Sequence, residues 1–213
     1  DTDWHPKLSV TSLDIETNER EEIYAISLVT YQTDSEDTRL ESVHIIGSDS
    51  QGIVVAHKDE KNLLGAFAEE LLHIDPDIIT GWNVIDFDLP VLRQRFRRSG
   101  LRFRLGRTRD ESWIRQGERW GGSQATIHGR QVLDTMHLIR STQHRFEDYR
   151  LGTVSQSILG RGKTLEVDQQ QNMQQVLLNT YASDPDALAE YCLEDSRLVA
   201  DLLKEERLIG LYL

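Results

Sequence analysis

The chain has 213 residues and a mass of 24.5 kDa, with 38% hydrophobic and 28% charged side chains. These values exclude collagen-like, mucin-like and broadly disordered chains, and no apolar run approaches the ~20 residues needed to span a bilayer. The formal net charge of −12 argues against a free-standing protein that grips a nucleic-acid backbone, because such proteins normally present a basic face.

The pattern of apolar and polar residues predicts strands at 8–15, 23–31, 43–47, 77–82 and 127–133, the last with a turn at His128 and Gly129. Helical patterns lie at 62–72, 89–96, 135–143, 151–159, 173–181 and 185–207. Residues 106–125 are polar and rich in glycine, which indicates a loop or a weak hairpin. This order predicts one α/β domain over 1–213 with a mixed sheet. The first three strands should form an antiparallel meander, and the later strands should join it by crossovers.

The ends of the chain and its single cysteine indicate its context. The chain opens with Asp1 instead of Met, without the charged and apolar regions of a signal peptide, and closes on Leu213 directly after a long helical pattern. We therefore expect a domain that belongs to a longer protein. Cys192 has no second cysteine to pair with, which fits a reducing compartment.

Positive charge gathers at residues 93–109, which we call the arginine-rich segment. It holds eight arginines and no carboxylate, so the rest of the chain carries a net charge of −20. One interpretation is a solvated helix face and loop, and another is a local contact for an anion or a neighbouring domain. The arginines are Arg93, Arg95, Arg97, Arg98, Arg102, Arg104, Arg107 and Arg109.

The first candidate site is at the end of the first predicted strand and reads Leu13-Asp14-Ile15-Glu16-Thr17. Because side chains alternate along a strand, Leu13 and Ile15 should face the core while Asp14 and Glu16 share the other face. Two like charges on one face repel, so they need a cation or water between them. A divalent metal would satisfy both carboxylates, although acidic pairs at this spacing also arise by chance in so acidic a chain.

The second candidate site, residues 81–90, lies where the strand at 77–82 ends and the next helix begins. Ends of strands are where α/β folds place their ligands. Asp88 stands just before Leu89 and Pro90, which suits an N-cap as well as a catalytic carboxylate. Asp86 suits either role equally, and periodicity alone does not choose between the two acids.

The third candidate site is a carboxylate within the apolar stripe of the last helix. Asp195 falls in the middle of this stripe, where a carboxylate is costly unless it is paired, metal-bound or protonated. Tyr191 precedes it by about one turn on the same side. In the structural alternative, Asp195 pairs with a buried arginine or caps a backbone group. The stripe consists of Leu188, Tyr191, Cys192, Leu198, Val199 and Leu202.

Acids from three separate segments can therefore converge on one pair of divalent cations. Carboxylates with water suit the hard cations Mg²⁺ and Mn²⁺, and the sequence has no Cys/His cluster of the zinc type. Two such ions ~3.5–4 Å apart activate water and stabilise the leaving oxygen in phosphoryl transfer.

Together, these residues resemble the three exonuclease motifs of the proofreading domain of family B DNA polymerases. Residues 12–17 are similar to the first motif, 83–88 to the second and 191–195 to the third. The motifs occur in the order of the family, and the segments 75–83 and 105–107 are also similar, most of all to one bacterial branch. The resemblance covers nearly the whole chain.

The resemblance implies a ribonuclease H-like fold, with a mixed five-stranded sheet flanked by helices. It implies a 3′–5′ exonuclease that removes mispaired nucleotides from single-stranded or frayed DNA and releases nucleoside 5′-monophosphates, with two Mg²⁺ or Mn²⁺ ions as cofactors. The expected partners are the 3′ end of a single DNA strand and the polymerase domains of the same parent chain. The expected location is cytoplasmic and nucleoid-associated, without a membrane.

The resemblance also assigns roles to residues, and it favours Asp88 over Asp86. Asp14 would bridge both ions, Asp88 would act at the second, and Tyr191 would orient the attacking water. No His lies within 185–206, which favours this tyrosine (DEDDy) type over the histidine type. The metal ligands would be Asp14, Glu16, Asp88 and Asp195. The single strand would be held by Thr17, Asn83 and Phe87.

Two departures and two alternatives accompany this resemblance. The chain lacks a polymerase palm and fingers, and its negative charge suggests that much of the grip on DNA lies on other domains. The family often carries a strand-separating hairpin, for which residues 117–131 are the candidate. One alternative is a non-catalytic module that binds single strands or docks to other domains through the arginine-rich segment. The other is a free-standing ribonuclease of the same superfamily.

Overall fold

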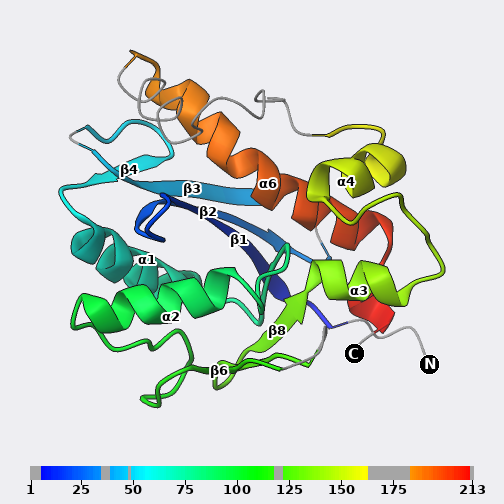
Figure 1. The fold of residues 1–213 in the computed structure, drawn as a ribbon, viewed down its shortest axis with the longest axis horizontal. Helices are drawn as coiled ribbons and strands as arrows, with labels where there is room; N and C mark the ends of the chain where they lie inside the picture. The colour runs from blue at the N-terminus through cyan, green and yellow to red at the C-terminus, as the bar shows by residue number, and fades with distance from the viewer. Residues whose placement is uncertain (1–5, 35–38, 48, 118–121, 163–182, 212–213) are drawn as a thin grey trace.

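A mixed sheet of six strands forms the centre of the molecule in this computed structural model, which describes residues 6–34, 39–47, 49–117, 122–162 and 183–211 (Figure 1). The strand order is β4 (Val54–His57), β3 (Arg39–Ile46), β2 (Ile23–Gln32), β1 (Ser9–Thr17), β5 (Ile78–Gly81) and β8 (Gln131–Asp134). Strands β1, β2 and β3 form the predicted antiparallel meander, and β5 and β8 continue the sheet parallel to β1.

Helices cover both faces of the sheet (Figure 1). On one face lie α1 (Glu60–Ile74) and α2 (Asp88–Arg98), and on the other lie α3 (Thr135–Ser141), α4 (Leu151–Leu159) and α6 (Pro185–Glu205). A 3₁₀ turn follows α6 at Leu208–Leu211. Within the described ranges, no helix has the length and apolar character that crossing a membrane requires. This arrangement is the ribonuclease H-like fold, so the predicted fold class is confirmed.

Local signals in the sequence set the limits of α1. Asp59 has an extended backbone, and its Oδ1 accepts a hydrogen bond from the Asn62 N–H at 2.9 Å, which caps the helix. Asp75 ends the helix with a left-handed φ of 52°. Burial of each large apolar side chain contributes about 2 kcal/mol. The fully buried stripe consists of Leu63, Leu64, Phe67 and Leu71.

Short elements account for the differences from the sequence-based expectations. The sheet has one strand more than the five expected, because β4 adds four residues at its edge. The strand expected over 127–133 is β8 alone, after a turn at His128 and Gly129. Strands β6 (Trp113–Arg115) and β7 (Gln124–Thr126) pair antiparallel, in agreement with the loop or weak hairpin predicted over 106–125, and only β7 lies within the 117–131 candidate for a strand-separating hairpin. The expected helix at 173–181 lies outside the described residues.

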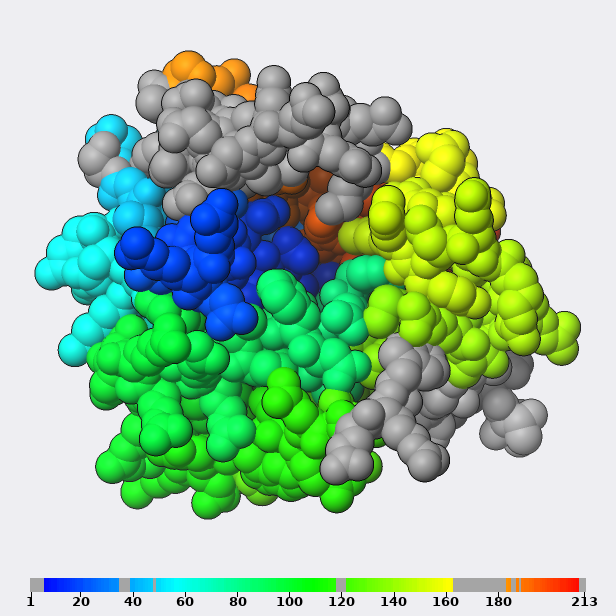
Figure 2. Space-filling view, in the orientation of Figure 1, coloured from blue at the N-terminus to red at the C-terminus, as the bar shows by residue number. Residues whose placement is uncertain are grey.

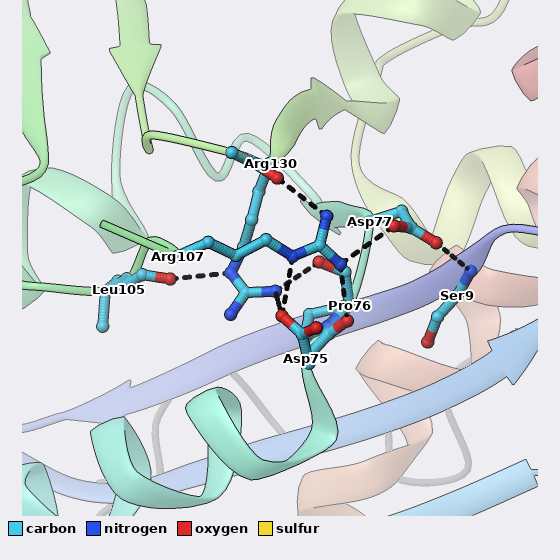
Figure 3. A network of polar contacts seen from close by, with 8 residues as sticks. Ser9, Asp75, Pro76, Asp77, Leu105, Arg107 and Arg130 are labelled. Carbon is cyan, nitrogen blue, oxygen red and sulfur yellow. Dashed lines mark hydrogen bonds and ion pairs between the residues drawn. The ribbon is translucent and has the colours of Figure 1, made fainter.

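An ion-pair network joins the segments that lead into the parallel strands (Figure 3). Arg107 Nε donates to Asp75 Oδ1 at 2.7 Å, and its Nη2 donates to Asp77 Oδ1 at 2.9 Å. Arg130, whose side chain is wholly buried, donates to the same Asp75 oxygen at 2.8 Å and to two backbone carbonyl oxygens. A buried guanidinium is tolerated only with such partners.

The network reaches β1 through Asp77, which directly precedes β5. Asp77 Oδ2 accepts a hydrogen bond from the Ser9 N–H at 2.9 Å, and its carbonyl oxygen accepts one from the Gln131 N–H at 2.8 Å. These bonds align the first residues of β1, β5 and β8. Since the three strands run in the same direction, their carboxyl ends meet at the opposite end of the sheet.

Replacing Arg130 with Met should lower the free energy of unfolding by about 3 kcal/mol, because two buried carbonyl oxygens lose this donor and Asp75 keeps only Arg107. Arg98→Met is the matched control, since Arg98 is exposed and makes no side-chain hydrogen bond or ion pair within the described residues. Its effect should stay within about 0.5 kcal/mol. Urea denaturation followed by circular dichroism measures both variants. Equal stabilities would contradict a stabilising role for the network.

Candidate active site

The two acids of the first motif lie on one face of β1, as the alternation of side chains predicts. Leu13 and Ile15 are buried with the α1 and α2 side chains, at 1% and 5% exposure. Asp14 and Glu16 are only partly buried, and both raise the pKa of Cys192 on α6, after the larger effect of its burial. The two carboxylates therefore face the helix that carries the third motif.

Asp88 is the first residue of α2 and is 2% exposed. Its Oδ1 accepts a hydrogen bond from the Ile15 N–H at 3.3 Å, which brings it beside the acids of β1. The N-cap of α2 is Phe87, so the alternative in which Asp88 is the N-cap is wrong. Burial, and then the carboxylates of Asp134 and Glu16, raises the pKa of Asp88 to about 7.

Asp86, the other acid of the second motif, has a different environment. Its Oδ2 lies 3.0 Å from Nε2 of His137 on α3. A carboxylate that an imidazole already engages is less available to a cation than one that is buried among other carboxylates. The geometry therefore favours Asp88 as the acid that belongs with Asp14 and Glu16.

The apolar stripe of α6 is buried, and Asp195 lies at its margin. Asp195 and Tyr191 are both partly exposed, so Asp195 is not enclosed in the core as its place in the stripe suggested. Asp195 acts together with Glu16 and Asp14 in raising the pKa of Tyr191, so it lies near the acids of β1. The Leu188 side chain is outside the described part of the chain. The stripe residues with at most 2% exposure are Cys192, Leu198, Val199 and Leu202.

A buried hydrogen bond fixes α6 to the sheet directly beside Asp195. Ser196 Oγ lies 2.8 Å from Ser27 Oγ on β2. Ser27 is the cross-strand partner of Asp14, so this bond brings the first and third motifs together. Figure 2 shows α6, in orange-red, set back between the blue β1–β2 region and the yellow-green α3–α4 region. Asp88, which begins α2, and Asp195 on α6 thus both lie near the acids of β1.

The negative charge of these acids affects the pKa of Tyr191. Burial is the main cause that raises its pKa, and the carboxylates of Glu16, Asp195 and Asp14 add to the effect. The phenol therefore remains protonated at neutral pH, with a hydroxyl proton that it can donate. This is the ionisation state in which a tyrosine can orient a water molecule.

The donor set fits a hard divalent cation by chemistry and by charge. Carboxylate oxygens are the ligands that Mg²⁺ and Mn²⁺ prefer. The carboxylates reinforce the pKa shifts of Asp88 and Tyr191, so the site favours added positive charge. As the side chains lie, no three His, Cys, Asp or Glu residues of the described part stand close enough together to hold a metal ion. Ion binding would therefore require the carboxylates to move together.

The three residues expected to hold the DNA strand lie at the end of β1 and in the loop before α2. Thr17 ends β1 and is partly buried. Asn83 has a positive φ of 62° and forms the turn that follows β5. Phe87 is 44% exposed, which leaves its ring accessible to a base. Thr17 directly follows Glu16, Phe87 directly precedes Asp88, and Asn83 lies in the turn that leads to Asp88.

The arginine-rich segment contains both structural and exposed residues. Arg95 is buried and pairs with both carboxylate oxygens of Glu60, at 2.7 and 2.5 Å. Arg107 belongs to the network at the strand starts, and Arg93 donates to the Ile114 carbonyl oxygen at 3.2 Å. These arginines stabilise the fold, so the segment as a whole is not a solvated face.

Arg97, Arg98 and Arg102 are exposed around the end of α2, and Arg109 is exposed further along the segment. They make no side-chain hydrogen bond or ion pair within the ranges that the structure describes. Arg97 and Phe87 line a cavity of about 810 Å³ along α2, which none of the four candidate ligands lines. Arg97 therefore borders an open space that begins at the second motif.

Two residues near the candidate site escaped the sequence analysis. Asp134 ends β8 and is 3% exposed, and burial is the main cause that raises its pKa. His137 lies in the first turn of α3 and contacts Asp86. Asp134 stands at the end of an apolar strand and directly before a helix, so the strand-end argument that selected residues 81–90 would also have found it.

The chain belongs to the exonuclease domains of family B DNA polymerases. The family model described as "DNA polymerase family B, exonuclease domain" matches residues 1–154, which include the first two motifs. This agrees with the resemblance of the motifs and with the fold.

Its relatives include a bacterial and several eukaryotic polymerases. It is 31% identical to DNA polymerase II of Escherichia coli (strain K12) over 218 residues, which cover 99% of this chain and 27% of that protein. DNA polymerase delta catalytic subunits of Mesocricetus auratus and Caenorhabditis elegans are 33% and 30% identical to it, over 74% and 75% of this chain and 15% of each relative. The chain thus spans about a quarter or less of the length of these relatives, which are large polymerases.

Asp88 should make the metal-free protein less stable as the pH rises from about 4 to about 7. Its pKa of about 7 in the folded state lies above the ordinary value of 3.8, so the folded state holds one more proton than the unfolded state across this range. The resulting loss of stability should approach about 1.4 kcal/mol per pH unit. Urea unfolding in EDTA at several pH values measures it.

Asp88→Asn should flatten this pH dependence, because the amide does not titrate. Glu147→Gln, which changes an exposed carboxyl between α3 and α4, is the control and should leave the dependence unchanged. Identical pH profiles for the wild type and Asp88→Asn would show that another group controls the stability in this range.

Proposed function

We propose that this domain is a metal-dependent 3′–5′ exonuclease that removes nucleotides from the end of a single or frayed DNA strand and releases nucleoside 5′-monophosphates. The observation that carries the proposal is the convergence of acids from β1, α2 and α6. Two bonds support this convergence, from Ile15 to Asp88 and between Ser27 and Ser196. Membership of the polymerase exonuclease family supports nuclease chemistry.

The proposed site holds two Mg²⁺ or Mn²⁺ ions. When bound, such ions activate water and stabilise the leaving oxygen of the phosphodiester. Tyr191, which stays protonated, would orient the attacking water from the turn of α6 that precedes Asp195. The proposed ligands are Asp14, Glu16, Asp88 and Asp195.

The proposed grip on the DNA end consists of Thr17, Asn83 and Phe87. The exposed ring of Phe87 would stack on a base, and stacking of this kind contributes about 1–3 kcal/mol per base. Thr17 and Asn83 would supply polar contacts from the end of β1 and from the turn after β5. Because stacking is tolerant of base identity, this grip suits an enzyme that must remove any mispaired nucleotide.

Asp14→Ala and Asp195→Ala should each lower nucleotide release by at least roughly 100-fold while leaving the fold intact. Loss of a residue that only supports a metal ligand typically costs roughly 10–100-fold, and loss of the ligand itself should cost more. The measurement is the shortening of a 5′-labelled single-stranded DNA oligonucleotide with Mg²⁺, Mn²⁺ or EDTA. Asp110→Ala, at an exposed acid outside the site, is the control. Full activity of either ligand variant would contradict the proposed site.

A second candidate function is single-strand binding or domain docking through the exposed arginines, without catalysis. The observation that favours it is that Arg97, Arg98 and Arg102 are exposed and lack partners within the described residues. Such binding would not depend on divalent ions, whereas the nuclease would. The two functions are also compatible, since exposed arginines can hold the strand that a nuclease site shortens.

Replacing Arg97, Arg98 and Arg102 together with Glu should weaken binding of single-stranded DNA and reduce its dependence on salt, because fewer phosphate contacts release counterions. Fluorescence anisotropy of a labelled oligonucleotide at several salt concentrations, with EDTA, measures this effect. The variant Arg109→Glu, which reverses one exposed charge elsewhere in the segment, provides a comparison. Unchanged affinity in the triple variant would exclude these arginines as the DNA contact.

The parent protein and its location are also part of the proposal. We place the domain within a longer polymerase, as a single unit over residues 1–213 that contacts the polymerase domains of the same chain in a nucleoid-associated, cytoplasmic setting. The lengths of the relatives support this context. A comparison of DNA and RNA oligonucleotides in the same assay separates this enzyme from a free-standing ribonuclease.

A further inference from the structure

The loop that leads to Asp88 is not fixed by a cap of its own helix. It runs over residues 82–87, and Phe87 at the N-cap makes no side-chain hydrogen bond. A helix start without a capping side chain needs partners from other elements. Within the loop, the Asn83 carbonyl oxygen accepts hydrogen bonds from the N–H groups of Asp86 at 3.2 Å and Phe87 at 2.9 Å. The loop is thus one tight turn with its own internal hydrogen bonds.

Asp134 supports this turn from the neighbouring strand. Its Oδ1 accepts a hydrogen bond from the His137 N–H at 3.2 Å and so caps α3. Its Oδ2 accepts a second bond from the Ile85 N–H at 3.0 Å. With 3% exposure, the carboxylate makes both bonds away from solvent. One side chain therefore joins the end of β8, the start of α3 and the middle of the loop.

His137 makes a second contact with the same loop, because its Nε2 lies 3.0 Å from Asp86 Oδ2. Asp134 holds the backbone of His137, so both contacts come from one helical turn. By comparison, the bond from the Ile15 N–H to Asp88 Oδ1 is long, at 3.3 Å. The position of Asp88 therefore depends on how firmly the loop before it is held.

We infer that Asp134 and His137 form a clamp that positions Asp88 for metal binding, and that both are positioning residues and not ligands. This inference rests on the proposed nuclease function. Both oxygens of Asp134 already accept backbone N–H groups, so it acts through the loop that carries Asp88. Loss of partners outside the ligand shell typically weakens metal binding by roughly 10–100-fold.

Asp134 differs from a residue that only caps a helix, because its second carboxylate oxygen accepts the bond from the Ile85 N–H. In Asp134→Ser, the shorter side chain with one oxygen still caps α3, but it cannot also accept the bond from Ile85. Asp59→Ser is the matched control, because Asp59 caps α1 in the same way without joining the candidate site. A residue that served only as a cap would give the same result at both positions.

Variants of His137 test the other half of the clamp. His137→Leu removes the contact with Asp86 while the backbone bond to Asp134 remains. His137→Gln keeps a side-chain donor that can reach the same carboxylate, so it should rescue the function. This pair also decides the question if Asp134→Ser does not fold.

The experiment titrates Mn²⁺ into the 213-residue chain and follows free Mn²⁺ by electron paramagnetic resonance, a readout that needs no catalysis. The Mg²⁺ dependence of DNA cleavage and the unfolding temperature are measured in parallel. Asp134→Ser and His137→Leu should weaken Mn²⁺ binding by roughly tenfold or more and raise the Mg²⁺ requirement of cleavage to a similar extent. His137→Gln and Asp59→Ser should bind Mn²⁺ like the wild type.

The outcomes separate the clamp from the function on which it rests. If Asp134→Ser and His137→Leu only lower the unfolding temperature and bind Mn²⁺ as tightly as the wild type, the clamp is overturned and the nuclease proposal stands. If the wild type neither binds Mn²⁺ nor cleaves DNA, the proposed function is overturned, and the clamp with it.

Discussion

The candidate site depends on the alignment of the three parallel strands β1, β5 and β8. Ser12 of β1 lies opposite Thr80, and Gly81 lies opposite Asp134, so β5 and β8 end together while β1 continues beyond them to Thr17. A slip of one residue in β1 would turn Asp14 to the opposite face of the sheet. Polar contacts hold the register at both ends, through the arginine network at the strand starts and a buried bond of 2.8 Å between Thr80 and Thr135 near their ends.

Aspartates near the two ends of these strands have pKa values that are shifted in opposite directions. At the starts, hydrogen bonding from Arg107, and also from Arg130, lowers the pKa of Asp75. At the carboxyl ends, burial and neighbouring carboxylates raise the pKa of Asp88, and burial raises that of Asp134. An ionised aspartate thus stabilises the fold where arginines surround it, and it destabilises the fold where it is buried beside other carboxylates. Such locally unfavourable charge is expected where function requires it.

Long periodic elements and the buried apolar run of β5 could be predicted from the sequence, and the edge strand β4 and tertiary contacts could not. The helical pattern at 151–159 predicted the bounds of α4. The alternation of side chains along β1 predicted the face of the sheet on which Asp14 lies. Strand β4 has four residues, as β5 has, but only one of them is buried, so it lacks the fully buried apolar run that identified β5. The stripe of α6 placed Asp195 among apolar neighbours, but only the packing of α6 on the sheet determines that this residue lies at the margin.

Distance along the chain explains why the arginine-rich segment could not be interpreted from sequence. Arg95 pairs with Glu60, which lies 35 residues away, and Arg107 pairs with Asp75 at a separation of 32. Nothing in the local pattern distinguishes these residues from Arg97, which is exposed. Asp134 illustrates the same limit, since its bond to Ile85 spans 49 residues. Whether an arginine stabilises the fold or remains available to bind a ligand thus depends on its tertiary partners and not on its residue type.

The net charge of the domain also constrains how the proposed nuclease would bind its substrate. A phosphodiester that approached the acids around Asp88 without cations would meet repulsion from a site that already disfavours ionisation of this residue. Each divalent ion would reverse part of that charge, so binding of metal and of DNA should strengthen each other by the same factor. Exposed Arg97 lines the same cavity as Phe87, outside the acidic site, where it can attract the strand without neutralising the carboxylates that the ions require. An acidic domain can therefore act on a polyanion if its cations are supplied at the site and its arginines remain along the approach.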